Sequence, residues 1–168
     1  KRIGVSTKSA SRCFDELEYL NIDVLGMKGK SRVINIPDDR EQLWQQIENV
    51  LRNPVIRRFV LREDKKLEKK AGISALCEYS LLSDNVYPTY AVTKKELKDS
   101  GVKVEKQVSE LEEIGCVVLE LGYFIDFLGK GLQDPLSVVL SFTGEEQEEE
   151  RVDISINEML EEYVWSKD

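Results

Sequence analysis

The chain has 168 residues, of which 41% are hydrophobic and 33% are charged, and its formal net charge is −8. This composition is typical of a globular protein with a hydrophobic core, and no run approaches the ~20 apolar residues that a membrane-spanning helix needs. The acidic total argues against nucleic-acid binding by the whole surface, but residues 1–37 contain seven Lys/Arg and only four Asp/Glu.

The first predicted element is a helix over residues 7–20, which begins with hydroxyl and basic side chains and ends with acidic and apolar ones. Ser6 is a typical N-cap, and Val5 and Ala10 have the spacing of a hydrophobic staple. Apolar side chains recur at i, i+3, i+4 and i+7, which predicts one buried face. That face consists of Ala10, Cys13, Phe14, Leu17 and Leu20.

A β-hairpin is predicted next, because two short apolar segments at 24–25 and 33–36 flank the Gly-rich basic segment 26–32. Asp38 is expected to cap a helix over 40–51, and a strand is expected over 55–61. Three arginines belong to this strand and its end (Arg57, Arg58 and Arg62), and we expect them to form a solvated face. The charged segment 62–70 is predicted to connect two regions.

The second region is predicted to be mixed α/β. Helices are expected over 71–82, 94–99, 135–141 and 144–165, strands over 87–93 and 116–121, and residues 102–114 fit either structure. Trp44 and Trp165 are expected to be core or interface anchors. The predicted fold class is therefore α+β, with one domain over 1–62 and another over 71–168.

A helix, a short turn and a hairpin with a basic tip are the last two thirds of a winged helix-turn-helix. The segment "GVSTKSASRCFDELEYLNIDVLGMKGKSRVINI" resembles the recognition helix and wing of MarR-like transcriptional regulators over residues 3–36. The resemblance implies a bacterial, cytoplasmic, dimeric protein that binds double-stranded DNA. It also implies helices before the recognition helix, so residues are expected to precede Lys1.

The residue types fit the same interpretation. A helix N-terminus attracts phosphate, hydroxyl groups donate hydrogen bonds to phosphates or base edges, and Lys and Arg add positive charge. The predicted DNA contacts are Ser6, Thr7, Lys8, Ser9, Ser11 and Arg12 from the helix and Lys28, Lys30, Ser31 and Arg32 from the hairpin. About six neutralised phosphates would give a slope of log K against log salt near −5. The alternative is that Ser6 is only a cap and that the hairpin tip is a solvated turn.

Catalysis and metal binding are not favoured by the sequence. The chain has no histidine, and Cys13, Cys77 and Cys116 are far apart without a CxxC pair, which argues against a zinc site and a disulfide framework. Glu120 and Asp134 could suggest a metal-dependent nuclease, but the lysine expected at position 122 is a glycine. We therefore predict no enzyme, no metal and no cofactor.

The order of a winged helix and a mixed α/β region is similar to the architecture of AbiEi-type antitoxins, which bind DNA as autoregulators. The main prediction is a sequence-specific, homodimeric transcriptional regulator whose C-terminal region serves dimerisation or sensing. Its first rival is an antitoxin-like autoregulator whose acidic C-terminal region binds a basic protein partner. A second rival is a small-molecule sensor, and a third is a nuclease-related domain.

Overall fold

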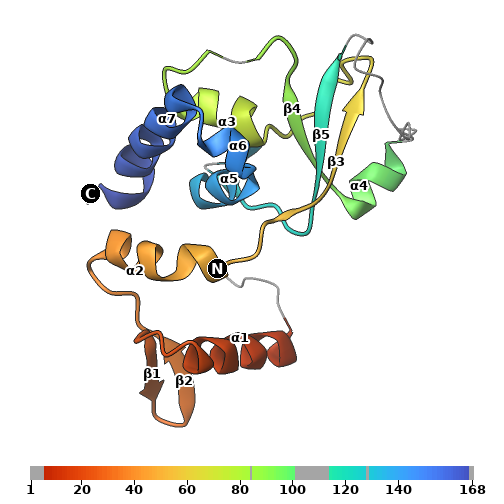
Figure 1. Cartoon of the computed structure of the whole chain (residues 1–168). Helices are drawn as coiled ribbons and strands as arrows, with labels where there is room; N and C mark the ends of the chain where they lie inside the picture. Colours follow the sequence, from red (N-terminus) through yellow and green to blue (C-terminus); the bar gives the residue numbers. More distant parts are fainter. Residues whose placement is uncertain (1–5, 84, 101–113, 128, 167–168) are drawn as a thin grey trace. The chain divides into compact units, whose positions relative to one another are not determined.

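The computed structural model describes residues 6–83, 85–100, 114–127 and 129–166 (Figure 1). The chain forms two compact units, Lys1–Leu51 and Arg52–Asp168. Helices and both parallel and antiparallel strand pairs are present, so the predicted α+β class is confirmed. The winged helix-turn-helix assignment of the first unit stays a prediction.

The first unit begins with α1 (Thr7–Tyr19), as predicted. Ser6 is its N-cap, because the Ser6 hydroxyl oxygen accepts a hydrogen bond from the backbone N–H of Ser9 at 3.1 Å. The predicted staple residue Val5 lies outside the described residues.

The predicted buried face of α1 is only partly right, because no residue of this helix is buried. Ala10, Phe14 and Leu17 are half-buried, whereas Cys13 and Leu20 are exposed. Among the described elements of this unit, the hairpin is the one that packs against α1, and a four-residue hairpin strand cannot cover a helix of 13 residues.

The hairpin consists of β1 (Leu25–Lys28) and β2 (Ser31–Ile34), which pair antiparallel. Lys28 pairs with Ser31, so Gly29 and Lys30 form a two-residue loop. Gly29 has φ = +64°, which suits the first loop position of a type II′ turn. The tip therefore presents two lysines on either side of a glycine.

The next helix is α2 (Arg40–Ile47), which continues as η1 (Glu48–Val50). Its N-cap is Asp39 and not the predicted Asp38, because Asp39 Oδ1 accepts a hydrogen bond from Gln42 N at 2.8 Å. A cap carboxylate reaches the N–H three positions along the chain, so the start at Arg40 selects Asp39. Trp44 is buried, as expected for a core anchor.

The second unit contains a three-stranded sheet in the order β3 (Val55–Leu61), β5 (Cys116–Leu121), β4 (Thr89–Thr93). The central strand β5 is buried along its whole length, antiparallel to β3 and parallel to β4. The sequence pattern places β3 in a domain over 1–62, but this strand is an edge strand of the second unit's sheet. Residues 62–70, predicted to connect two regions, instead lie inside the second unit, between β3 and the helix that begins at Gly72.

Side chains of β5 alternate between two cores, as the period of a strand requires. Cys116 and Val118 pack with Leu61, Val92 and Leu97, so α4 (Lys94–Asp99) covers one face of the sheet. The other face carries a second set of apolar residues, Ala71, Ala91, Val117, Leu119 and Leu121.

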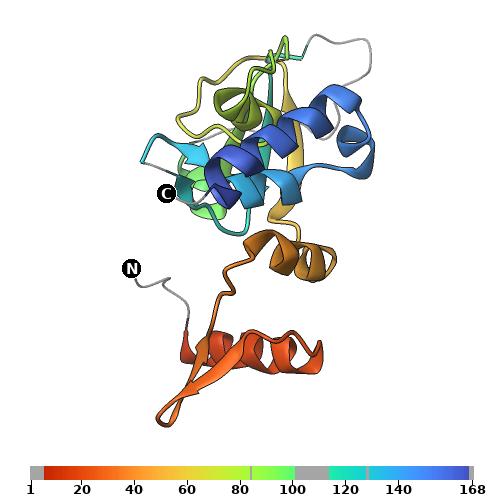
Figure 2. The same ribbon diagram turned by 90° about the vertical axis from the view of Figure 1, so that its left-hand side faces the viewer.

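A layer of helices covers this second face, and it lies to one side of the strands in Figure 1 and in front of them in Figure 2. It comprises α3 (Gly72–Tyr79), α5 (Pro135–Ser141), α6 (Gly144–Gln147), α7 (Glu150–Leu160) and the π-helical turn η2 (Glu161–Trp165). Leu76, Val138 and Met159 are fully buried at the centre of this layer, and Trp165 packs against its edge.

Three details of the second unit differ from the prediction or escape it. The helix predicted over 144–165 is divided into two. The first, α6, starts at a capping box formed by Thr143 and Glu146, and the second, α7, starts at Glu150. Strands β6 (Asp126–Phe127) and β7 (Leu132–Gln133) are not predicted, since two residues carry no periodic pattern. Of the ambiguous segment 102–114, all but Ile114 lies outside the described residues.

Candidate nucleic-acid interface

The first turn of α1 presents polar and basic side chains to solvent. Thr7, Lys8 and Ser9 are exposed in this turn, which contains no acidic residue, and Arg12 is exposed in the second turn. The Ser6 and Ser9 hydroxyl groups lie 2.9 Å apart and hydrogen-bond to each other, so both already serve the cap. The positive end of the helix dipole is therefore not neutralised by a carboxylate of its own turn.

The hairpin tip is a second cationic point. Lys28, Lys30 and Ser31 are exposed, and neither lysine has an ion-pair partner within the ranges that the structure describes. Lys8 and Arg12 share this property. These four cations (Lys8, Arg12, Lys28 and Lys30) will be called the free cations.

Arg32 differs from the free cations because it connects the hairpin to α1. Its Nη1 donates a hydrogen bond to Asp15 Oδ1 at 2.7 Å, and its Nη2 donates one to Ser11 Oγ at 2.9 Å. The guanidinium also lies 5.0 Å from the centre of the Phe14 ring. The planar guanidinium group of Arg32 thus makes two hydrogen bonds and one ring contact. Together these contacts fix β2 against the helix.

The Arg32 contacts relate the helix cations to the hairpin. Residues 8, 11, 12 and 15 are three or four positions apart, so they lie on one face of α1. The hairpin is held on this face through Ser11 and Asp15. Lys8 and Arg12 therefore share the face of α1 to which Arg32 attaches the hairpin, although they lie in the N-terminal half of the helix and Figure 1 shows the hairpin extending from its C-terminal end.

Four of the ten predicted contacts thus have partners inside the unit, and two of them, Ser6 and Ser9, bind each other at the helix cap. Ser11 and Arg32 bind each other, and Arg32 also offsets the charge of Asp15. No local pattern predicts this contact, because Arg32 and Asp15 are 17 positions apart. From the sequence alone, a basic residue on a predicted strand and a helix face with Phe14 and Asp15 only weakly indicate that the two will be in contact.

The arginines of β3 have partners in the second unit. Arg57 Nε donates a hydrogen bond to Oε2 of the buried Glu120 at 2.7 Å, directly across the β3–β5 pair. Arg58 binds Glu146 through two hydrogen bonds of 2.6 and 3.0 Å. Burial raises the pKa of Glu146, but the hydrogen bonds from Arg58 and Thr143 outweigh burial and lower the pKa overall. Arg57 and Arg58 are exposed, as predicted, and each of them also forms an ion pair.

The acids considered for a nuclease also have structural roles. Glu120 pairs with Arg57, and Asp134 caps α5 by accepting a hydrogen bond from Ser137 N at 3.1 Å. Over the described residues, no group of three His, Cys, Asp or Glu side chains could hold a metal ion. A search of the same residues found no helix with the length and apolar character to span a membrane.

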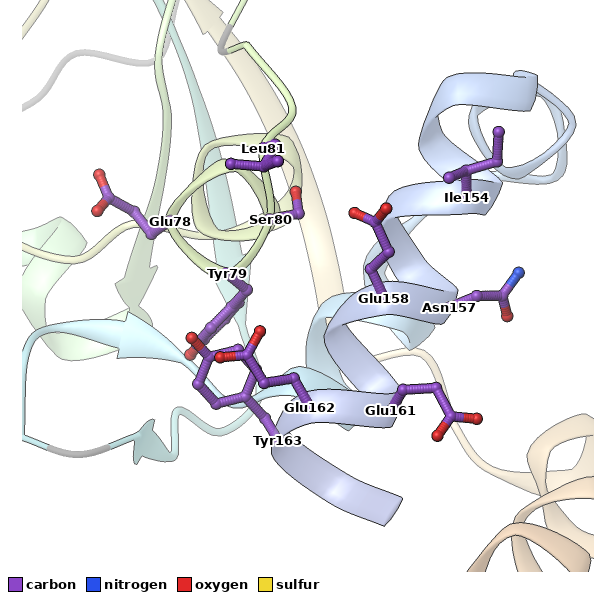
Figure 3. A pocket seen from close by; sticks show the side chains of 10 residues that line it. All are labelled: Glu78, Tyr79, Ser80, Leu81, Ile154, Asn157, Glu158, Glu161, Glu162 and Tyr163. Carbon is purple, nitrogen blue, oxygen red and sulfur yellow. The ribbon is translucent and has the colours of Figure 1, made fainter. Parts of the chain in front are cut away.

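An open groove of about 970 Å³ lies in the second unit between the end of α3 and the helix formed by α7 and η2 (Figure 3). Four carboxylates line it, together with two tyrosines and two exposed aliphatic side chains: Glu78, Glu158, Glu161, Glu162, Tyr79, Tyr163, Leu81 and Ile154. Burial, and then the charge of Asp134, raises the pKa of Tyr79 far above its usual value. The Tyr79 hydroxyl group donates a hydrogen bond to the carbonyl oxygen of Gln133 at 2.7 Å, which fixes the Tyr79 ring at the bottom of the groove.

Comparison with known proteins found no family model, no curated protein and no solved structure that matches the chain.

Proposed function

We propose that the first unit binds duplex DNA through the N-terminal turns of α1 and the tip of the β1–β2 hairpin, and that the protein is a transcriptional regulator. The observation that carries this proposal is the set of four free cations on one body, with no acid in the first turn of α1. Side chains of this kind neutralise backbone phosphates and release counterions.

In this proposal α1 enters the major groove with its first two turns. Thr7 and Arg12 reach base edges or phosphates, since hydroxyl groups bind either and arginine binds guanine through two hydrogen bonds. Lys28, Lys30 and Ser31 contact the backbone beside the groove. Arg32 is a positioning residue, which sets the distance between the helix and the hairpin and neutralises Asp15.

A winged helix-turn-helix that works as a homodimer is the architecture we propose for this binding. Four free cations give modest affinity at physiological salt, and two copies on half-sites one helical turn apart would multiply it. A selected site with two inverted half-sites, and a dimer mass in sedimentation at the concentration used for binding, would support this part of the proposal.

The experiment starts from the full chain and a pool of random duplexes of about 30 base pairs. Bound duplexes are recovered and sequenced through several rounds, and the enriched duplex is then titrated by fluorescence anisotropy at a series of salt concentrations. Each neutralised phosphate contributes about −0.9 to the slope of log K against log salt, so four free cations predict about −4 per copy of the chain. No enrichment, or a slope near zero, would contradict DNA binding by this unit.

A further inference from the structure

The groove between α3 and the α7–η2 helix combines a negative rim with an apolar floor. Figure 3 shows Glu158 and Glu162 pointing from the helix toward the end of α3, whereas Asn157 and Glu161 point away. Glu158 and Glu162 are four positions apart, so their carboxylates repeat along the groove by one helical turn.

The carboxylates on the helix side are not neutralised by the fold. Glu78 forms an ion pair with Lys70, but Glu158, Glu161 and Glu162 have no Lys or Arg partner in the described parts of the chain. The surrounding unit adds to this field, because residues 52–168 contain 24 Asp/Glu and 16 Lys/Arg. A negatively charged cleft attracts cationic partners and repels nucleic acid.

Apolar surface is exposed in the same place. The Leu81 side chain is 98% exposed and Ile154 is 50% exposed, on opposite sides of the groove. Figure 3 shows the rings of Tyr79 and Tyr163 nearer the C-terminal end of the helix, where they lie 5.2 Å apart and both pack against Phe127. Tyrosine is enriched among the residues that contribute most to binding energy at interfaces, and apolar surface that is contiguous rather than scattered marks interaction sites.

We propose that this groove docks a basic amphipathic helix of a partner protein. Lysines or arginines on the flanks of such a helix would pair with Glu158 and Glu162, and its apolar side chains would contact Leu81, Ile154 and Tyr163. Helices that bind in grooves place such anchors at i, i+3, i+4 and i+7, which fits a groove that is lined by the helix from Ile154 to Tyr163.

A small organic cation is the main rival occupant. The volume of the groove is at the upper end of about 300–1,000 Å³ for small-ligand sites, but such sites enclose most of their ligand. A groove whose aliphatic side chains are so exposed cannot enclose a small cation, whereas a helix would cover them. The proposal concerns the second unit and is independent of the DNA-binding proposal.

The test uses the full chain and a fluorescein-labelled peptide of 18 Leu, Lys and Ala residues with an amphipathic helical pattern. Two control peptides have the same composition in scrambled order and Glu in place of Lys. We expect the amphipathic basic peptide to bind at least tenfold tighter than the scrambled one, and no binding of the acidic peptide.

The variant Glu158→Gln/Glu162→Gln should weaken peptide binding about tenfold, and Leu81→Ser should weaken it by a similar factor. The matched control is Glu145→Gln/Glu148→Gln, which makes the same change of charge outside the groove and should weaken binding less than twofold. Thermal unfolding verifies that each variant is folded, and the DNA affinity of all of them should equal that of the wild type.

Equal affinity for the scrambled peptide would overturn the proposal, and so would equal weakening by the two double variants. A third contrary result would be that spermine binds with micromolar affinity, displaces the peptide and is insensitive to Leu81→Ser. The last result would identify a small-cation site. A wild-type chain that fails to bind DNA but binds the peptide as described would contradict only the function proposed for the first unit.

Discussion

The two units use arginine and lysine in different ways. In the first unit Lys8, Arg12, Lys28 and Lys30 are exposed without acidic partners in the described residues, whereas Arg32 is paired. In the second unit Arg57, Arg58, Arg151, Lys65, Lys69 and Lys70 each bind a glutamate. Among the described residues, ion pairs therefore involve one cation of the first unit and six of the second, while other cations of the second unit, such as Lys94 and Lys95, are exposed. The net charge of −8 conceals this difference.

The units also differ in how much apolar surface they bury. Among the described residues, only Ile22, Val24 and Trp44 of the first unit are buried apolar residues, while the second unit contains 20. Burial of apolar surface is the main stabilising contribution to a fold. The first unit is therefore the less stable of the two, and its amide hydrogens should exchange faster than those of β5.

The largest effect is expected at the ion pair that joins β3 to β5. Glu120 is 2% exposed, and Arg57→Ala would leave its carboxylate buried without its partner. Loss of one member of a fully buried pair costs about 3–5 kcal/mol of unfolding free energy, and because the Arg57 side chain is 55% exposed we expect about 2 kcal/mol here. Urea unfolding of the full chain, followed by tryptophan fluorescence and circular dichroism, measures this change.

The control is Arg57→Met combined with Glu120→Leu, which replaces both charges by apolar side chains and should be within about 1 kcal/mol of the wild type. This double variant should also bind DNA like the wild type, because Arg57 forms its ion pair within the second unit and is not a proposed DNA contact. Weaker DNA binding by the double variant would contradict the difference proposed between the two units, since it would mean that a paired arginine of the second unit contacts DNA.

The next effect concerns the free cations of α1. Lys8→Ala/Arg12→Ala should weaken DNA binding about tenfold at physiological salt and reduce the salt slope by about 1.8 per copy, because two phosphate contacts are lost. The matched control is Lys94→Ala/Lys95→Ala, which removes two lysines of α4 in the second unit. Equal losses in both double variants would show that binding follows total charge and not the α1 surface.

Much of the secondary structure is predictable from the sequence, because local signals determine it. Ser6, Thr93, Asp134 and Thr143 cap helices through contacts within three residues, and the apolar run 116–121 identifies the central strand. The burial of α1 is not predictable, since periodicity indicates which face is apolar but not what covers it. The unit to which β3 belongs depends on pairing across about 60 residues, and no local pattern encodes that pairing.

The candidate site is predictable in its charges but not in its contacts. Exposed basic residues at a helix start and a hairpin tip follow from the sequence pattern, and the structure places all four free cations in solvent. The role of Arg32 depends on the distance between two elements, which only the folded chain defines. The groove is likewise formed by segments about 80 positions apart.

A smaller effect distinguishes positioning from direct contact at Arg32. Arg32→Ala should weaken DNA binding about threefold to fivefold while leaving the salt slope nearly unchanged, because no phosphate contact is lost. Asp15→Asn gives the sharper result. It removes a negative charge from the α1 surface, which would strengthen binding if Arg32 contacted DNA directly, but weaken it if the Arg32–Asp15 pair holds the hairpin.

The smallest effect concerns acid sensitivity of the second unit. The hydrogen bond from Lys69, together with those from Thr93, lowers the pKa of Glu96 to about 2, although burial opposes this change. A carboxyl group whose pKa is lower in the folded state stabilises the fold above its unfolded pKa of about 4.5, and this contribution is lost as the pH falls toward 2. Because the Glu96 side chain is 44% exposed, solvent screening reduces the contribution to about 0.5–1 kcal/mol.

Glu96→Gln should therefore lower the free energy of unfolding at pH 7 by this amount, and the difference from the wild type should shrink between pH 4.5 and pH 2. Urea unfolding at a series of pH values measures it, with Glu148→Gln as a control, since Glu148 is exposed and has no ion-pair partner within the described ranges. A difference that stays constant down to pH 2 would mean that Glu96 acts through its uncharged hydrogen bonds in the capping box with Thr93, and that the Lys69 pair is dispensable. In that case the pairing of cations in the second unit would be a result of crowding and not a source of its stability.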